Sequence, residues 1–206
     1  MHCNSIPRRS ATGMIATHRG RLSRCMAFLI VLALIGSQNL YSEAAAPTEY
    51  EVKAAYLYNL GKFVEWPART ATTPPDPFSI CVLGHDPFGA TLDTLIANET
   101  INGKSIVVKR LPKSQDAVGC NILFISSSEE GRLKDILSTL DKANVLTVSD
   151  MPQFTRHGGM IQFVLDNNRV RFEINLTSAE HAGLVLSSQL LKVAINVRRD
   201  SHPGGL

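Results

Sequence analysis

Histidine, cysteine, serine and carboxylate side chains carry most protein chemistry, and here none of them forms a catalytic or metal-binding pattern. The chain has no Gly-rich phosphate loop ending in Lys-Ser/Thr, no G-x-S-x-G elbow and no histidine pair at helical spacing with a glutamate between. His85, His157, His181 and His202 are scattered, whereas a zinc site needs three or four converging ligands. The sequence therefore predicts a binding protein and not an enzyme, with no metal ion and no cofactor.

The first 44 residues have the layout of a cleaved secretory signal. Arginines between positions 8 and 24 precede an apolar run over residues 26–35, and Ser42 and Ala44 supply the small residues for a cut after Ala44. The run is shorter than the ~20 residues of a membrane-spanning helix, so an uncleaved anchor is the less favoured alternative. We predict export to the periplasm, with translation starting at Met1 or Met14.

Loss of this segment changes both the charge and the cysteine content. Five of the 21 basic and one of the 18 acidic residues precede Ala45, which leaves 16 basic and 17 acidic residues. This balance argues against a nucleic-acid partner. Cys3 and Cys25 leave with the signal, so Cys81 and Cys120 remain. In an oxidising compartment we expect these two to form a disulfide, with two separate buried thiols as the alternative.

Strand and helix patterns alternate over residues 47–197. Alternation favours a single α/β domain with a mostly parallel mixed sheet flanked by helices. We expect a C-terminal β-hairpin followed by a long helix, and a flexible tail over 198–206. The predicted elements are helix 48–64, strands 78–83 and 105–110 around helix 86–97, strand 121–125, helix 127–142, strand 144–148, hairpin strands 160–165 and 169–175, and helix 177–197. Capping boxes starting at Ser127 and Thr177 open the last two helices.

Two segments could present a protein-binding surface. The first helix and its end are rich in aromatic residues, of which Tyr58 and Trp66 are candidates for exposed contacts; core packing is the alternative. In the strand over 169–175, polar and apolar residues alternate, so Arg171, Glu173 and Asn175 should share one face. That face is either a polar recognition strip or an ordinary solvated surface.

Long stretches at both ends of the predicted domain match one known pattern. The matching segments are 51–67 (EVKAAYLYNLGKFVEWP), Cys81 with Leu83-Gly84, 121–125 (NILFI), 158–161 (GGMI), 171–175 (RFEIN) and 190–194 (LLKVA). Together they resemble the YfiR-like periplasmic repressor family, and the resemblance covers about residues 49–197.

The resemblance implies a soluble periplasmic α/β domain that binds the sensor domain of a membrane-bound diguanylate cyclase. Such binding keeps cyclic di-GMP output, and with it biofilm formation, low. A disulfide supports the family fold, and Cys81 and Cys120 stand where that bridge is expected. Some members carry a second cysteine pair in the later half, which this sequence lacks. Because relatives also occur beside sensor kinases and transport systems, the implied partner is the periplasmic domain of an inner-membrane diguanylate cyclase or sensor kinase.

A rival hypothesis is a periplasmic small-ligand receptor that feeds a sensor kinase or transporter. Its site would be a cleft at the carboxyl ends of the parallel strands, near Gly84-His85 and Ser126-Ser127. Self-association as a homodimer stays open in either case.

Overall fold

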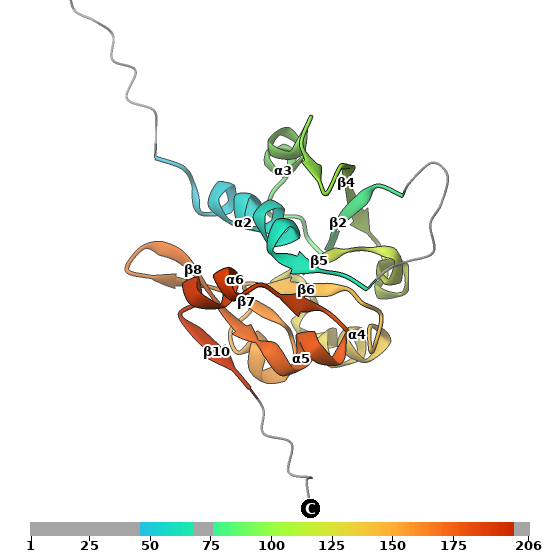
Figure 1. The fold of residues 1–206 in the computed structure, drawn as a ribbon, viewed down its shortest axis with the longest axis vertical. Helices are drawn as coiled ribbons and strands as arrows, with labels where there is room; N and C mark the ends of the chain where they lie inside the picture. The colour runs from blue at the N-terminus through green and yellow to red at the C-terminus, as the bar shows by residue number, and fades with distance from the viewer. Residues whose placement is uncertain (1–45, 68–75, 200–206) are drawn as a thin grey trace, which may run out of the picture. The chain divides into compact units, whose positions relative to one another are not determined.

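A mixed sheet of eight strands, in the order β10-β8-β7-β6-β5-β2-β4-β3, lies at the centre of the fold (Figure 1). The computed structural model describes residues 46–67 and 76–199, so the predicted signal peptide and residues 200–206 of the predicted tail lie outside the described residues. The strands of the sheet are β2 (Phe78–Leu83), β3 (Thr100–Ile101), β4 (Lys104–Leu111), β5 (Ile122–Ile125), β6 (Leu146–Ser149), β7 (Ile161–Asp166), β8 (Arg169–Asn175) and β10 (Asn196–Arg198).

Five neighbouring strands, β4, β2, β5, β6 and β7, run parallel. The predicted hairpin is present as antiparallel β7 and β8, β10 runs parallel to β8, and β3 pairs antiparallel with β4. Strands β2 and β5 are buried along their whole length, as expected of parallel strands with near-continuous apolar sequences. The predicted fold class, a mostly parallel mixed sheet flanked by helices in one α/β domain, is confirmed.

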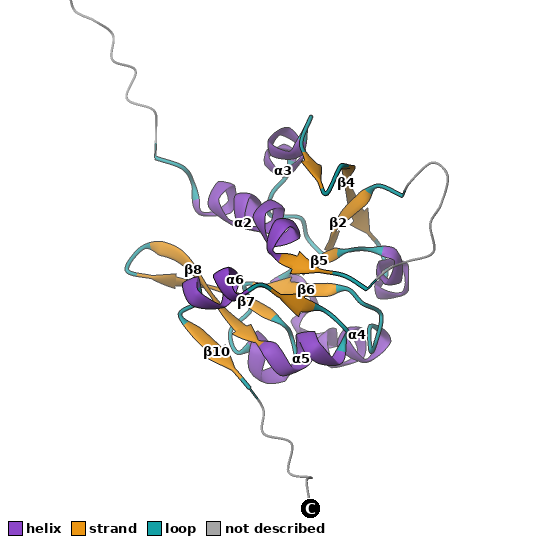
Figure 2. Cartoon of the chain, in the orientation of Figure 1, coloured by secondary structure: helices purple, strands orange, loops and turns teal. Residues whose placement is uncertain are grey.

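Helices flank this sheet (Figure 2). They are the α-helices α2 (Glu49–Phe63), α3 (Ala90–Ile96), α4 (Leu133–Thr139), α5 (Leu176–His181) and α6 (Ser188–Val193), and the 3₁₀ helices η1 (Ser114–Gly119), η2 (Ser127–Arg132) and η3 (Phe154–His157). A capping box starts α2: the Glu51 N–H donates to the Thr48 hydroxyl over 3.3 Å, and the Thr48 N–H donates to the Glu51 carboxylate over 2.6 Å. This helix buries Ala54, Leu57 and Leu60.

The side chains of the sheet divide between two apolar clusters. Along β2, Ile80 and Val82 join the cluster that contains buried residues of α2, α3, α5 and α6, while Cys81 and Leu83 join the cluster of η1, α4 and η3. This division follows from the alternation of side chains along a strand. Both faces of the central strands are therefore covered.

The long closing helix predicted over 177–197 is wrong. The chain forms α5, a short strand β9 (Val185–Leu186), α6 and β10 instead. Gly183 ends the first helical segment with φ +73°, a left-handed conformation that glycine adopts without strain. The Ser187 hydroxyl then accepts from the Leu190 N–H and starts α6. Leu184, Leu186 and Leu190 of this segment are buried at separate places, whereas other apolar residues of the segment, such as Val185 and Val193, are exposed.

The starts of three other helices also differ from expectation. The Asp86 carboxylate accepts from the Phe88 N–H over 2.8 Å, so this stretch forms an Asx turn and α3 begins only at Ala90. Ser126, not Ser127, is the N-cap of the 3₁₀ helix η2, and α4 begins only after η2. Asn175, not Thr177, caps α5. In each case the competing local hydrogen bond decides where the helix begins.

Candidate protein-interaction site

Cys81 and Cys120 form the predicted disulfide, with their Cα atoms 6.2 Å apart. Cys81 lies within β2, and Cys120 ends η1 two residues before β5 begins. The bridge therefore ties neighbouring strands at the centre of the sheet. Both residues are at most 2% exposed, so the bridge lies within the core.

Trp66 joins the end of α2 to the residue that follows this disulfide. Its indole N–H donates to the Asn121 carbonyl over 3.2 Å, and its ring meets Phe78 edge-on at a centroid distance of 5.2 Å. The Asn121 side-chain oxygen in turn accepts from the Ser79 N–H of β2 over 3.0 Å. These contacts pack the half-buried Trp66 against the core.

Tyr58 is also engaged within the chain. Its hydroxyl donates to the Glu99 carboxylate, and the Lys62 ammonium lies 3.9 Å from the centre of its ring. Glu99 directly precedes β3, at the opposite end of the strand order from β8. The structure therefore does not bring Tyr58 together with the polar residues of β8.

Arg171 and Glu173 belong to the polar face predicted for β8. Both are half-buried, so each keeps part of its surface exposed to solvent. Their cross-strand neighbours on β7 are Val164 and Gln162, and Asn196 of β10 lies beside Glu173 on the other side. This arrangement agrees with the predicted alternation of the strand.

The third predicted member of the strip, Asn175, is not a surface residue. It is 1% exposed, and its amide donates to the Thr155 carbonyl over 2.9 Å while its oxygen accepts from the Ser178 N–H over 3.0 Å. Alternation correctly predicted its side of the sheet, but η3 and α5 pack there and cover it. Asn175 therefore links β8 to both elements.

A buried ammonium ties α2 to the carboxyl end of β6. Lys53 is 3% exposed and lies 2.5 Å from the Glu49 carboxylate and 2.6 Å from that of Asp150, which also accepts from the Tyr50 hydroxyl over 3.1 Å. Burial alone would lower the pKa of Lys53, but hydrogen bonds to Asp150 and Glu49 outweigh burial and raise it. The pKa of Tyr50 is raised by burial and by the charge of Asp150. Each of these polar groups therefore has a charged or hydrogen-bonding partner within the cluster.

Near Gly84-His85 and Ser126-Ser127, where a cleft was predicted, the chain makes close local contacts. A Cβ placed on Gly84 would lie 2.5 Å from the Ser128 hydroxyl and 2.8 Å from the Glu129 side chain. The His85 N–H donates to the same hydroxyl over 2.9 Å. The backbone at the carboxyl end of β2 therefore packs closely against η2 at this position.

An apolar groove lies between α2 and α6, and sequence reasoning missed it. It has a volume of about 270 Å³, and its lining residues are Tyr56, Asn59, Leu60, Phe63, Phe172, Gln189, Leu190 and Val193. We call it the α2–α6 groove. Its floor is Phe172 of β8, which is 2% exposed, whereas Val193 at its rim is 56% exposed. The surplus of apolar residues in the last segment was the only available signal, and the predicted continuous helix concealed it.

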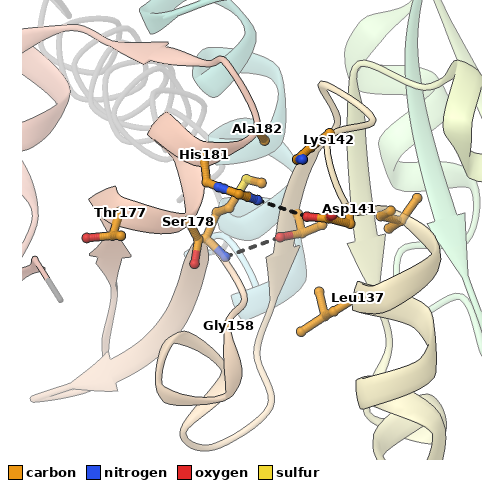
Figure 3. A pocket seen from close by; sticks show the side chains of 11 residues that line it. Leu137, Asp141, Lys142, Gly158, Thr177, Ser178, His181 and Ala182 are labelled. Carbon is orange, nitrogen blue, oxygen red and sulfur yellow. Dashed lines mark hydrogen bonds and ion pairs between the residues drawn. The ribbon is translucent and has the colours of Figure 1, made fainter. Parts of the chain in front are cut away.

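A second hollow, of about 200 Å³, lies between the end of α4 and α5 (Figure 3). His181 and Asp141 face each other across it, with 3.0 Å between the imidazole Nε2 and the carboxylate. Thr177, Ser178 and Lys142 add further polar groups to its lining. None of the interaction residues predicted from the sequence lines this hollow.

Among the described residues, no three histidine, cysteine or acidic side chains lie where they could hold a metal ion together. The same part of the chain contains no helix with the length and apolarity needed to cross a membrane.

Comparison with known proteins identifies the family. The family model described as YfiR/HmsC-like matches residues 50–195. The chain belongs to the YfiR/HmsC-like family. The match includes both cysteines of the disulfide, the whole of β8 and all the residues that line the α2–α6 groove.

Two solved structures resemble this YfiR/HmsC-like chain weakly. A conserved domain protein from Vibrio cholerae O1 biovar eltor is 13% identical, with a TM-score of 0.49 over 73% of this chain and 60% of that one. The ABC domain in complex with L-Trp from Streptococcus pneumonia is 12% identical, with a TM-score of 0.44 over 59% of this chain and 55% of that one.

Proposed function

We propose that this YfiR/HmsC-like protein is a periplasmic repressor of a membrane-bound diguanylate cyclase. It binds the periplasmic sensor domain of the cyclase and holds the enzyme in its inactive state. The family match over residues 50–195 carries this proposal. The Cys81–Cys120 disulfide in the core supports an oxidising compartment.

Repression of this kind works by differential affinity. A binding protein shifts its partner toward the inactive state only as far as it binds that state more tightly than the active one. Reversing an equilibrium from 99:1 to 1:99 requires about 5.5 kcal/mol of such preference. An extended interface with one or two buried apolar anchors supplies energies of this size.

The test is capture from membranes. The mature chain, residues 45–206, is immobilised and incubated with detergent-solubilised membranes of the source bacterium, and the bound proteins are identified by mass spectrometry. We expect an inner-membrane protein with a diguanylate cyclase domain, and its cyclase activity should fall when the mature chain is added. Recovery of no membrane signalling protein, or of a cyclase whose activity does not change, contradicts the proposal. Recovery of a sensor kinase instead would move the proposal to that class of partner.

Export is part of the same proposal. Protein purified from the periplasmic fraction should begin at Ala45 when its N-terminus is sequenced, because the predicted signal peptide ends at Ala44. A chain that keeps its first 44 residues contradicts this part of the proposal.

A further inference from the structure

The α2–α6 groove is held open by contacts at one of its ends. The Ser187 N–H, just before α6, donates to the Phe63 carbonyl at the end of α2 over 2.9 Å. Next to this bond, β1 (Val64–Glu65) pairs antiparallel with β9. Both walls of the groove are therefore fixed relative to each other. A site with fixed walls loses little conformational entropy when it binds.

The floor of the groove is fixed as well. The Tyr56 hydroxyl reaches the Val170 carbonyl of β8 over 3.4 Å, and its ring lies edge-on to Phe172 at a centroid distance of 5.5 Å. The lining is almost entirely apolar, and the polar side chains at the rim, Asn59 and Gln189, are uncharged amides. Such a site accepts a bulky apolar group, and amides can bond to the N–H and C=O groups of a peptide.

Exposed apolar residues continue from the groove to the edge of the sheet. Val193 at the rim is 56% exposed, and Ile195, two residues further on, is 41% exposed. The Ile195 N–H donates to the carbonyl of Phe172, the floor residue, over 3.0 Å. Asn196 of β10 pairs with Glu173 and Arg198 with Asn175, and the Asn175 N–H bonds to the Met160 carbonyl on the β7 side. The backbone groups of Asn196 therefore face β8, and the N–H of the next residue, Val197, points away from β8. Among the residues that the structure describes, β10 is the last strand at this end of the sheet.

We propose that the α2–α6 groove and the outer edge of β10 together bind an extended segment of the partner protein. The segment adds a strand beside β10 and places one bulky apolar side chain in the groove. Recognition by strand addition obtains affinity from main-chain hydrogen bonds and specificity from side-chain pockets. A lipid tail or a small apolar molecule fills the groove but makes no use of the strand edge, so the two features side by side favour a polypeptide. This inference rests on the proposed function for the identity of the partner, but not for the chemistry of the site.

The first experiment needs no knowledge of the partner. A displayed library of random linear peptides is selected on the immobilised mature chain, and the selected peptides are tested against V193E and V118E. Val118 on η1 is 48% exposed and lies outside the groove lining, so V118E is a matched control. We expect peptides with a bulky apolar residue in an extended context, bound at least tenfold more weakly by V193E and unchanged by V118E. Equal thermal midpoints for the two variants show that V193E is folded.

Two results would overturn the inference. One is that no peptide is selected while a fluorescent apolar dye still binds in a manner sensitive to V193E, which assigns the groove to small apolar molecules. The other is that selected peptides bind V193E as well as V118E.

A second measurement separates this surface from the proposed function. Hydrogen exchange of the Val197 amide should slow at least tenfold when a selected peptide, or the membrane protein captured by the wild type, is bound. If the wild type captures a cyclase and V193E captures it equally, the proposed function stands and this surface is wrong. If peptides bind at the groove but no cyclase is captured, the surface stands and the proposed function is wrong.

Discussion

Lys53 is the residue for which burial and charge conflict most strongly. Its ammonium is enclosed by the carboxylates of Glu49 and Asp150, and removing one partner of a buried ion pair leaves the others desolvated. We expect K53M to lower the free energy of unfolding by about 3 kcal/mol, the lower end of the usual range, because both carboxylates keep some solvent. Urea denaturation at neutral pH measures this change. The matched control is K62M in the same helix, where the lysine is exposed.

The contribution of Lys53 should depend on pH in a definite direction. Because its pKa is raised in the folded protein, its stabilisation is fully present below the usual lysine pKa of about 10.4 and is lost as the pH rises through the higher folded value. The difference in stability between wild type and K53M should therefore be constant from pH ~7 to ~9 and shrink above pH ~10.5. A difference that shrinks on the acid side of neutrality instead would show that the Lys53 charge is not its source.

Sequence patterns predicted the chemical character of individual residues better than their surroundings. Alternation placed Asn175 on the correct side of its strand, yet no pattern within one strand can show that η3 and α5 pack over it. Trp66 could be predicted as an aromatic residue at a helix end, but its partner, Asn121, is 55 residues away. Contacts between distant segments decide whether a side chain recognises a partner or holds the fold together.

At the scale of elements, the disulfide fixes the pairing of β2 with β5. The bridge closes a loop of 39 residues, and the chain-entropy model gives about 4 kcal/mol of stabilisation for such a loop. We expect C81S/C120S to lose stability of this order in urea denaturation, and to capture less partner through loss of fold. A reducing agent should destabilise the wild type to a similar extent and leave the double variant unchanged. Equal stability and equal capture by the double variant would show that the bridge has no structural role.

Gly183 separates α5 from β9, and it explains why the predicted long helix does not form. Its φ of +73° is unfavourable for any residue with a Cβ, and an added Cβ would lie 3.1 Å from the Asn144 side-chain nitrogen. That nitrogen donates to the Ala182 carbonyl. Backbone strain at position 183 and disturbance of this hydrogen bond should therefore both destabilise the variant. We expect G183A to lower the free energy of unfolding by about 1–2 kcal/mol. G131A is the control, since a Cβ there meets nothing within 4 Å; equal effects of the two substitutions would contradict this explanation.

The elements that the sequence predicted well are those with one strong periodic signal. The first helix and strands β2 and β8 agree with expectation within about one residue, because each has a single clear apolar pattern. Strands β1, β9 and β10 were missed, since two or three residues give too short a pattern to distinguish a strand from a loop. These short strands nevertheless shape the α2–α6 groove and the sheet edge. The fold class was therefore accessible from the sequence, whereas the surface that we propose for binding was not.

At the scale of the whole molecule, the two apolar clusters share one sheet and should unfold together. Their connection is direct: Cys120 belongs to the cluster of η1, α4 and η3, and the next residue, Asn121, accepts the hydrogen bond of Trp66 from the other side. Trp66 is the only tryptophan of the chain, so its fluorescence reports the cluster that contains α2. Far-UV circular dichroism reports helices of both clusters.

We therefore expect coincident urea transitions by fluorescence and circular dichroism for the mature chain, as a two-state domain requires. In C81S/C120S both transitions should move to lower urea together, because the loss affects the sheet that both clusters share. W66F is the control for the connection between the clusters, because it removes the indole donor to Asn121. We expect it to lower the free energy of unfolding by about 1 kcal/mol. The transitions seen by near- and far-UV circular dichroism should still coincide in W66F. Two separated transitions in the wild type would show that the clusters fold independently. A binding surface formed by α2, α6 and β10 would then no longer depend on the disulfide on the opposite side of the sheet.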